Sequence, residues 1–303
     1  MRLGVDLGGS KIEIVALGDS DEELLRRRVP TPRGDYAGTL NAIAALVEQA
    51  EDDLRRRGTL GVGIPGALSA LSGHVKNANS TCLIGKPLKT DLEALLQREI
   101  RLANDANCFA LSEASDGAAA GADVVFGIIL GTGVGGGIVV HGRVLTGTNA
   151  IAGEWGHNPL PPLPLQPGAD TPLAPCYCGR HGCIEGFLSG PAMRQDHFKR
   201  GGELLDPPAI VARAAAGDAA CEATLQRYET RLAMALAGVI NILDPAVIVV
   251  GGGLSNIPRL YVNVPRLWGR HVFSDHVATR LVRNRHGDSS GVRGAARLWE
   301  DQE

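Results

Sequence analysis

The chain has 303 residues, enough for about two domains of ordinary size. Hydrophobic residues make up 44% and charged residues 21%, proportions typical of soluble globular proteins, so extensive disorder is excluded. The 30 Lys and Arg and the 33 Asp and Glu give a net charge of −3, which offers no general attraction to nucleic acid, and no nucleic-acid partner is expected.

The first half of the chain predicts alternating strands and helices. Apolar runs bounded by glycine predict strands, and apolar residues at helical spacing predict helices. The expected elements are strands over residues 3–7, 12–17, 60–64 and 101–103, and helices over 40–54, 91–99 and from 104 to about 121. The first two strands form a hairpin with a glycine tip.

The second half repeats this pattern. The expected elements are strands over 124–130, 138–140 and 246–250, a proline-rich loop over 142–175, and helices over 219–243 and about 294–300. Glycine-tipped hairpins at 3–17 and 124–140 lie in halves that otherwise alternate strands with helices. We therefore expect an α/β fold built from a duplicated unit, with two lobes and a cleft between them.

The sequence gives no sign of export or membrane insertion. No apolar segment near the N-terminus is typical of a signal peptide, and no run approaches the ~18 apolar residues of a spanning helix. Three of the six cysteines gather between 176 and 183, which favours a metal site in a reducing compartment over disulfides. A cytoplasmic protein with no membrane partner is expected.

Two glycine turns are typical of phosphate binding, because backbone N–H groups surround a phosphate only where no Cβ intervenes. The first turn and its flanks are Asp6, Gly8, Gly9, Ser10 and Lys11; the second is Gly131, Thr132 and Gly133. The carboxylate of Asp6 suits Mg²⁺. The alternative is that both are simply tight hairpin turns.

A third glycine cluster, Gly251, Gly252 and Gly253, follows a buried strand. It suits the close approach of a flat ligand such as an adenine ring, and the alternative is a plain turn at a strand end.

Asp105 lies in Asn104-Asp-Ala-Asn107, where a strand ends and a helix begins. Asp and Asn are favoured helix caps, so capping is one interpretation. The other is a general base, since attack of a sugar alcohol on a γ-phosphate requires removal of the hydroxyl proton. The flanking amides of Asn104 and Asn107 would then orient a polyol.

The run Cys176-Tyr-Cys178-Gly-Arg-His-Gly-Cys183 places three thiols in eight residues, a spacing typical of zinc. A fourth ligand comes from His157 or from His181. We favour His157, because it would tie the proline-rich loop to the cysteines. Four protein ligands close the site, so the metal is expected to be structural. Glu154 and Glu185 flank this unit and would bind sugar hydroxyls.

These motifs together resemble the ROK family of sugar kinases. The resemblance rests on Asp6-Leu-Gly-Gly-Ser-Lys11, Asn104-Asp-Ala-Asn107, Gly131-Thr-Gly-Val-Gly-Gly-Gly137, Glu154-Trp-Gly-His157 and Cys176 to Glu185, in the family's order. Lys76-Asn-Ala-Asn-Ser80 and Glu154 to Pro161 are most similar to the bacterial fructokinase (manno(fructo)kinase) branch. The N-acetylglucosamine kinase branch is a close relative.

The resemblance implies an actin-like ATPase fold of the hexokinase and Hsp70 type. A small lobe would comprise residues 1–115 and 289–303, and a large lobe 116–288 with a zinc-binding insertion. It further implies ATP and Mg²⁺ as cofactors and a homodimer. Ser10 stands where the family usually has Thr.

The resemblance also implies roles for individual residues. Asp105 would be the catalytic base, and Gly251 to Leu254 would hold the adenosine. The implied sugar ligands are Asn79, Asn104, Asp105, Glu154, His157 and Glu185, and the implied zinc ligands are His157, Cys176, Cys178 and Cys183.

The leading hypothesis is an ATP-dependent kinase that phosphorylates a hexose, fructose or also mannose, at the 6-hydroxyl. The alternatives are an N-acetylglucosamine or glucose kinase of the same family, or a non-catalytic, sugar-responsive regulator. The Asp105 carboxylate, and a phosphate loop that starts at Asp6 without room for a DNA-binding segment, count against the regulator.

Overall fold

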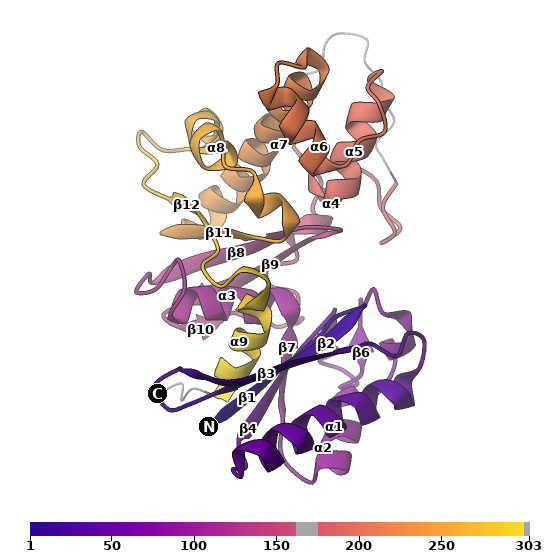
Figure 1. Cartoon of the computed structure of the whole chain (residues 1–303). Coiled ribbons are helices and arrows are strands. Elements are labelled where there is room, and N and C mark those ends of the chain that lie inside the picture. Colours follow the sequence, from indigo (N-terminus) through magenta and orange to yellow (C-terminus); the bar gives the residue numbers. More distant parts are fainter. Residues whose placement is uncertain (162–174, 300–303) are drawn as a thin grey trace. The chain divides into compact units, whose positions relative to one another are not determined.

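A computed structural model of the chain describes residues 1–161 and 175–299 (Figure 1). The later prolines of the expected 142–175 loop and the end of the final helix at residue 300 therefore lie outside the described residues. Among the residues described, no helix is long and apolar enough to cross a membrane.

The chain divides into two compact units. One comprises Met1–Gly121, Gly137–Ala152 and Arg285–Glu303, and the other comprises Ala122–Gly136 and Gly153–Asn284. The segment Gly137–Ala152, which the resemblance assigns to the C-terminal lobe, is grouped here with the N-terminal unit. The boundaries of the two lobes remain a prediction.

The N-terminal unit is built on a five-stranded sheet of order β3-β2-β1-β4-β7. Its strands are β1 (Arg2–Leu7), β2 (Lys11–Leu17), β3 (Glu23–Pro30), β4 (Thr59–Ile64) and β7 (Arg101–Asn104). β2 runs antiparallel to β1 and β3, whereas β1, β4 and β7 are parallel neighbours. The carboxyl ends of the three parallel strands therefore meet at one edge of the sheet.

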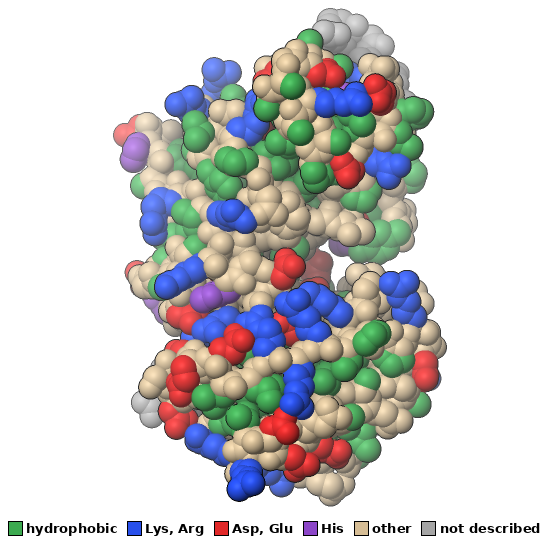
Figure 2. Space-filling model, in the orientation of Figure 1, with side chains coloured by type: hydrophobic (Ala, Val, Ile, Leu, Met, Phe, Trp, Pro, Cys, Tyr) green, Lys and Arg blue, Asp and Glu red, His purple; other side chains and the backbone are tan. Residues whose placement is uncertain are grey.

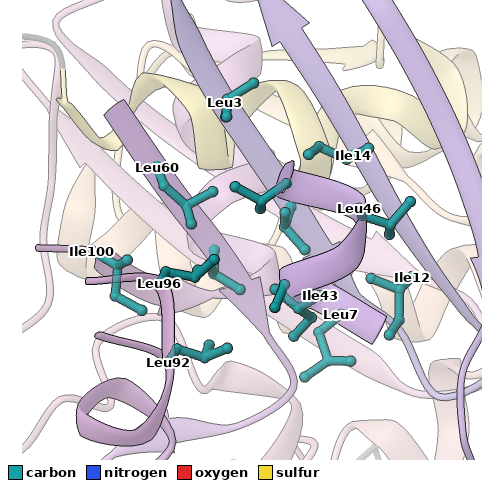
Figure 3. Close-up of a cluster of buried hydrophobic side chains, with 14 of the residues drawn as sticks. Leu3, Leu7, Ile12, Ile14, Ile43, Leu46, Leu60, Leu92, Leu96 and Ile100 are labelled. Atoms are coloured by element: carbon teal, nitrogen blue, oxygen red, sulfur yellow. The ribbon is translucent and has the colours of Figure 1, made fainter. Parts of the chain in front are cut away.

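Helices cover both faces of this sheet. Figure 1 shows α1 (Tyr36–Leu54) and α2 (Leu88–Leu96) on one face, and α3 (Asp105–Ser115) and α9 (Ser290–Ala296) on the other. Figure 3 shows the core beneath α1 and α2, where Leu7 of β1 lies beside Ile43 of α1; Leu3 of β1 and Leu46 of α1 belong to the same cluster. Because side chains alternate along a strand, Gly4 and Asp6 of β1 face the opposite side.

Glycines allow α9 to lie directly on the sheet. A Cβ on Gly4 would lie 2.1 Å from the carbonyl oxygen of Val292, and one on Gly61 would lie 1.9 Å from that of Ala295. Any larger residue at either position would push α9 away from β1 and β4. Part of the glycine excess in the composition therefore serves packing.

The second sheet has the order β10-β9-β8-β11-β12, which repeats the chain-order pattern of the first. Its strands are β8 (Val124–Leu130), β9 (Val134–Val140), β10 (Arg143–Val144), β11 (Val247–Gly251) and β12 (Arg280–Arg283). β8, β11 and β12 are parallel. The two sheets agree with the expected duplication.

The C-terminal unit carries α4 (Glu185–Leu188), α5 (Gly190–Lys199), α6 (Pro207–Ala215), α7 (Ala219–Leu243) and α8 (Leu260–Trp268). The short strands β5 (Ala67–Leu68) and β6 (Val75–Lys76) form a separate pair in the N-terminal unit. Short 3₁₀ helices include Thr81–Leu83, Trp155–His157 and Gly253–Asn256.

Several expected bounds are wrong. The helix expected over 91–99 is α2, Leu88–Leu96, since Gln97 adopts a left-handed conformation that ends it. The helix expected to reach about 121 ends at Ser115. β9 begins at Val134 instead of 138, so most of the expected glycine turn is strand. The final helix is Ser290–Ala296, continued by a 3₁₀ turn to Trp299.

Candidate active site

The first glycine turn is a rigid loop between β1 and β2. Gly8 N donates to Lys11 O at 3.0 Å, and a Cβ on Gly8 would lie 2.9 Å from that same oxygen. Thr31, just after β3, braces the loop: its Oγ1 donates to Gly8 O at 2.7 Å and its N–H donates to Ser10 O at 3.1 Å. The loop is held from both sides, while Gly9 and Ser10 remain exposed.

Asp6 and Asp105 lie at the carboxyl edge of the first sheet. Asp6 belongs to β1, and Asp105 is the first residue of α3, directly after β7. Burial raises the pKa of Asp6 to about 7, with the negative charges of Asp105 and Glu13 adding to the effect and Lys11 opposing it. The two aspartates therefore lie close enough to repel each other.

Asn104 performs the capping that Asp105 would otherwise perform. Its Oδ1 accepts from Ala106 N at 2.9 Å, and its Nδ2 donates to Gly66 O at 2.9 Å. Asp105 Oδ1 also accepts from Ala106 N, at 2.8 Å. The carboxyl group of Asp105 is thus oriented by the first turn of α3, while Asn104 caps that turn.

Asn79 lies beside the first glycine turn. It lines a cavity of ≈ 290 Å³ in the N-terminal unit, together with Gly9, Ser80 and Arg33. A Cβ on Gly9 would lie 3.7 Å from Ser80 Oγ. One expected sugar ligand and one expected phosphate-binding residue therefore share a cavity.

The second glycine turn lies beside Glu185 in the C-terminal unit. Glu185 Oε2 accepts from Val134 N at 2.9 Å, and a Cβ on Gly133 would lie 2.6 Å from the same oxygen. Gly131 O accepts from Gly190 N at 2.8 Å. Glycine at position 133 makes room for the Glu185 carboxylate. An expected sugar ligand therefore lies against an expected phosphate-binding turn.

The glycines after β11 have separate roles. Gly252 has a φ of +78°, and a Cβ there would lie 2.5 Å from Leu130 O, so the neighbouring strand β8 already requires glycine. At Gly253 a Cβ would meet nothing within 4 Å, which leaves room beside it. Leu254 is buried.

Glu154 and His157 are fixed by the tryptophan between them. Trp155 is buried, its Nε1 donates to Gly135 O at 2.9 Å, and its ring packs edge-on against Phe126 at 5.7 Å between centroids. The 3₁₀ turn Trp155–His157 therefore cannot rotate without breaking this anchor.

His157, Cys176, Cys178 and Cys183 form one cluster, with their ligand atoms within 4.8 Å of one another. The sulfurs of Cys178 and Cys183 are 3.6 Å apart, and Cys176 Sγ lies 3.6 Å from His157 Nδ1. Four ligands around tetrahedral zinc place sulfurs ~3.8 Å apart, so this donor set fits zinc. His181, the alternative ligand, instead forms a β-bridge with Pro175.

Sequence reasoning missed Tyr177. Its hydroxyl lies 3.0 Å from His157 Nε2, and the two rings meet edge to face at 5.2 Å. Partial desolvation raises the pKa of Tyr177 to about 12, and the charges of Glu185, Cys176 and Glu154 add to the effect, although most of the side chain is exposed. The position of this residue inside the cysteine motif was the one signal that could have pointed to it.

Comparison with known proteins agrees with these motifs. The family model for ROK matches residues 2–302. The chain belongs to the ROK family.

Two solved ROK structures are similar along nearly the whole chain. A ROK hexokinase from Thermus thermophilus is 32% identical, with a TM-score of 0.83 over 97% of this chain and 96% of that one. A ROK family glucokinase from Streptomyces griseus, in complex with glucose and AMPPNP, is 27% identical, with a TM-score of 0.78 over 98% of each chain. The actin-like ATPase fold expected of this ROK protein is thereby confirmed.

A curated relative is similar in sequence over the same extent. The N-acetyl-D-glucosamine kinase of Yersinia pseudotuberculosis serotype IB is 43% identical over 301 residues, 98% of each chain. This relative does not confirm the fructokinase branch, which the motifs most resemble.

Within this ROK protein, the expected residues fall into two groups by unit. The N-terminal unit brings together Asp6, the first glycine turn, Asn79, Asn104 and Asp105. The C-terminal unit holds the second glycine turn with Glu185, and the cluster of His157 with the three cysteines.

Proposed function

We propose that this protein is an ATP-dependent kinase that phosphorylates the 6-hydroxyl of N-acetylglucosamine. The observation that carries the choice of sugar is the 43% identity, spread over 98% of both chains, to a protein named N-acetyl-D-glucosamine kinase. The solved ROK glucokinase with glucose and AMPPNP supports a sugar and a nucleoside triphosphate as the two substrates.

Asp105 serves as the base in the proposed reaction. Its carboxylate takes the proton of the 6-hydroxyl while that oxygen bonds to the γ-phosphorus and the bond from phosphorus to ADP breaks. Asn104 is fixed to Gly66 O and caps α3, so Asp105 enters the reaction from a preset position. The proposed sugar ligands are Asn79, Asn104, Asp105, Glu154, His157 and Glu185.

The backbone N–H groups of the first glycine turn, with Ser10 and Lys11, would bind phosphate. The turn at Gly131, Thr132 and Gly133 is proposed as a second phosphate-binding turn. Gly253, with open space beside it, would admit the adenosine next to Gly251, Gly252 and Leu254.

The carboxylates of the N-terminal unit fit a magnesium ion. Desolvation and the charge of Asp105 both raise the pKa of the half-buried Asp6, so a divalent cation beside Asp6 would stabilise its ionised form. Asp6 is the residue we expect to hold Mg²⁺ or its water. When bound, the ion neutralises charge on the transferring phosphoryl group.

We also propose a structural zinc on His157, Cys176, Cys178 and Cys183. Its four protein ligands leave no open position for substrate, so its role is to join the 3₁₀ turn at His157 to the cysteine motif. Glu154 and Glu185, on either side of this junction, would thereby be held in place. Assembly as a homodimer stays a prediction that light scattering can check.

Fructose, with mannose, is the second candidate substrate. It is favoured by the run from Lys76 to Ser80, which resembles the fructokinase branch and contains Asn79 of the cavity. The two candidates differ at the sugar 2-position, where one substrate carries an acetamido group.

The test is the purified protein with ATP and Mg²⁺ against N-acetylglucosamine, fructose, mannose and glucose. We expect the highest kcat/KM with N-acetylglucosamine. If kcat/KM is highest with fructose, the protein is a fructokinase and the first proposal is wrong. Sugar binding without ADP release for any of the four would instead favour a non-catalytic regulator.

A further inference from the structure

A tight turn follows β3 and carries an arginine that the sequence motifs did not single out. Asp35 N donates to Pro32 O at 3.2 Å, and Gly34 adopts a φ of +74°, so Arg33 occupies the second position of a closed turn. Thr39 Oγ1 of α1 donates to Asp35 O at 2.7 Å. The backbone of Arg33 is therefore fixed at the start of α1.

The Arg33 side chain reaches the first glycine turn. Its Nη2 donates to Ser10 Oγ at 3.0 Å. Thr31, two residues before Arg33, donates hydrogen bonds to Gly8 O and Ser10 O. The Arg33 guanidinium is thus held beside the loop that would bind the phosphates, although Arg33 lies 22 positions after Lys11 in the sequence.

Arg33 differs from its basic neighbours in the group with which it interacts. Lys11, Arg26 and Arg28 all form ion pairs with the buried carboxylate of Glu13. Figure 2 shows Lys and Arg side chains gathered near β3 and α9, interleaved with Asp and Glu. Within the described ranges, no carboxylate forms an ion pair with Arg33, and a hydroxyl is its hydrogen-bond partner.

Arg33 also faces a space that a ligand can enter. It lines the cavity of ≈ 290 Å³ together with Gly9, Asn79 and Ser80. A guanidinium has five N–H donors in a planar fork that matches the oxygens of a phosphate, and one donor to Ser10 leaves most of that fork for a ligand. An anion with several oxygens is the ligand that this arrangement fits.

We propose that Arg33 binds the phosphoryl group that the enzyme transfers. This inference rests on the proposed kinase function and deepens it. The group belongs to ATP before the reaction and to the sugar 6-phosphate after it, so Arg33 contacts both of these ligands. It contacts neither ADP nor the free sugar.

The test compares Arg33→Gln with wild type by calorimetry, using four probes with Mg²⁺: AMPPNP, ADP, N-acetylglucosamine 6-phosphate and N-acetylglucosamine. We expect affinity for AMPPNP and for the sugar phosphate to fall about 10- to 100-fold, as is typical for loss of a charge-assisted hydrogen bond. Affinities for ADP and the free sugar should stay within about twofold. Arg33→Lys should recover part of the loss.

Arg27→Gln is the matched control, because Arg27 lies on β3 and pairs with Asp53 of α1. It removes the same charge nearby, and we expect all four affinities to match wild type. In turnover assays, Arg33→Gln should lower kcat and leave the KM for the sugar within about twofold. General loosening of the loop would change both constants.

Three results would overturn the proposal. If Arg33→Gln loses equal affinity for AMPPNP and ADP, Arg33 only braces the loop. If it loses affinity for the free sugar, Arg33 contacts the sugar. If all four affinities are unchanged, Arg33 contacts none of these ligands. Failure of the proposed function is read separately, from the absence of turnover by wild type. The AMPPNP and ADP arms report on Arg33 in that case too.

Discussion

The half-buried carboxylate of Asp6 should destabilise the folded protein at neutral pH, and Asp6→Asn should remove this cost. The folded-state pKa of Asp6 is about 7, against an ordinary value of 3.8. Between these values the folded protein holds a proton that the unfolded chain has released, so the free energy of unfolding falls as pH rises. Each pKa unit corresponds to about 1.36 kcal/mol, so the full cost reaches about 4 kcal/mol above pH 7.

Asparagine keeps the size of the side chain, which matters because Asp6 lies against Gly63 and Gly291. Urea unfolding without Mg²⁺, at pH 4.5 and pH 8, measures the effect. Over that interval the stability of Asp6→Asn relative to wild type should rise by about 3 kcal/mol. Asp52→Asn, at an exposed position of α1, is the control, with an expected change below about 0.5 kcal/mol.

Addition of Mg²⁺ supplies a second reading. It should stabilise wild type at pH 8 and leave Asp6→Asn unchanged, while the variant, though more stable, loses its kinase activity. If the difference between wild type and variant is the same at both pH values, the carboxylate is hydrated in solution and the reasoning fails.

Three further predictions concern Asp105 and the metal cluster. Asp105→Asn should lower kcat by about 10²- to 10⁴-fold and keep sugar affinity, as turnover and calorimetry would show; an unchanged kcat removes Asp105 as the base. Cys178→Ser should lose the one zinc per chain and lower the Tm, whereas Cys82→Ser, outside the cluster, should retain both; equal metal content in the two variants would refute the site. Tyr177→Phe should weaken zinc about 10- to 100-fold in competition with a chelator, because it removes the partner of His157 Nε2; unchanged affinity would make that hydrogen bond incidental.

The local motifs were the part of the site most accessible from sequence. Asn104 and Asp105 were expected at the junction of a strand and a helix, and they lie where β7 meets α3. The three cysteines lie within eight residues, so their clustering needs little tertiary structure. From the sequence, His157 is favoured over His181 only because it would tie the proline-rich loop to the cysteines. In the structure, His157 is the histidine that clusters with the cysteines.

Features that depend on tertiary packing were missed. β3 was not predicted, because Arg26, Arg27 and Arg28 interrupt any alternation of apolar and polar residues, as an edge strand permits. The contact of Arg33 with Ser10 depends on the antiparallel pairing of that strand with β2, which brings the end of β3 to the glycine turn. The prediction of a two-stranded hairpin therefore left out the strand that positions Arg33.

The charges around the first glycine turn explain why a phosphate would need a cation there. Asp6 is half-buried and is repelled by Asp105, so an anion that approaches the loop meets negative charge at the end of the sheet. Lys11 is paired with Glu13, which leaves Arg33 as the guanidinium that faces the cavity. ATP without a metal should therefore bind weakly, and Mg²⁺ should strengthen its binding more in wild type than in Asp6→Asn. The same carboxylate that is expected to weaken the fold would thus give the site its requirement for a divalent ion.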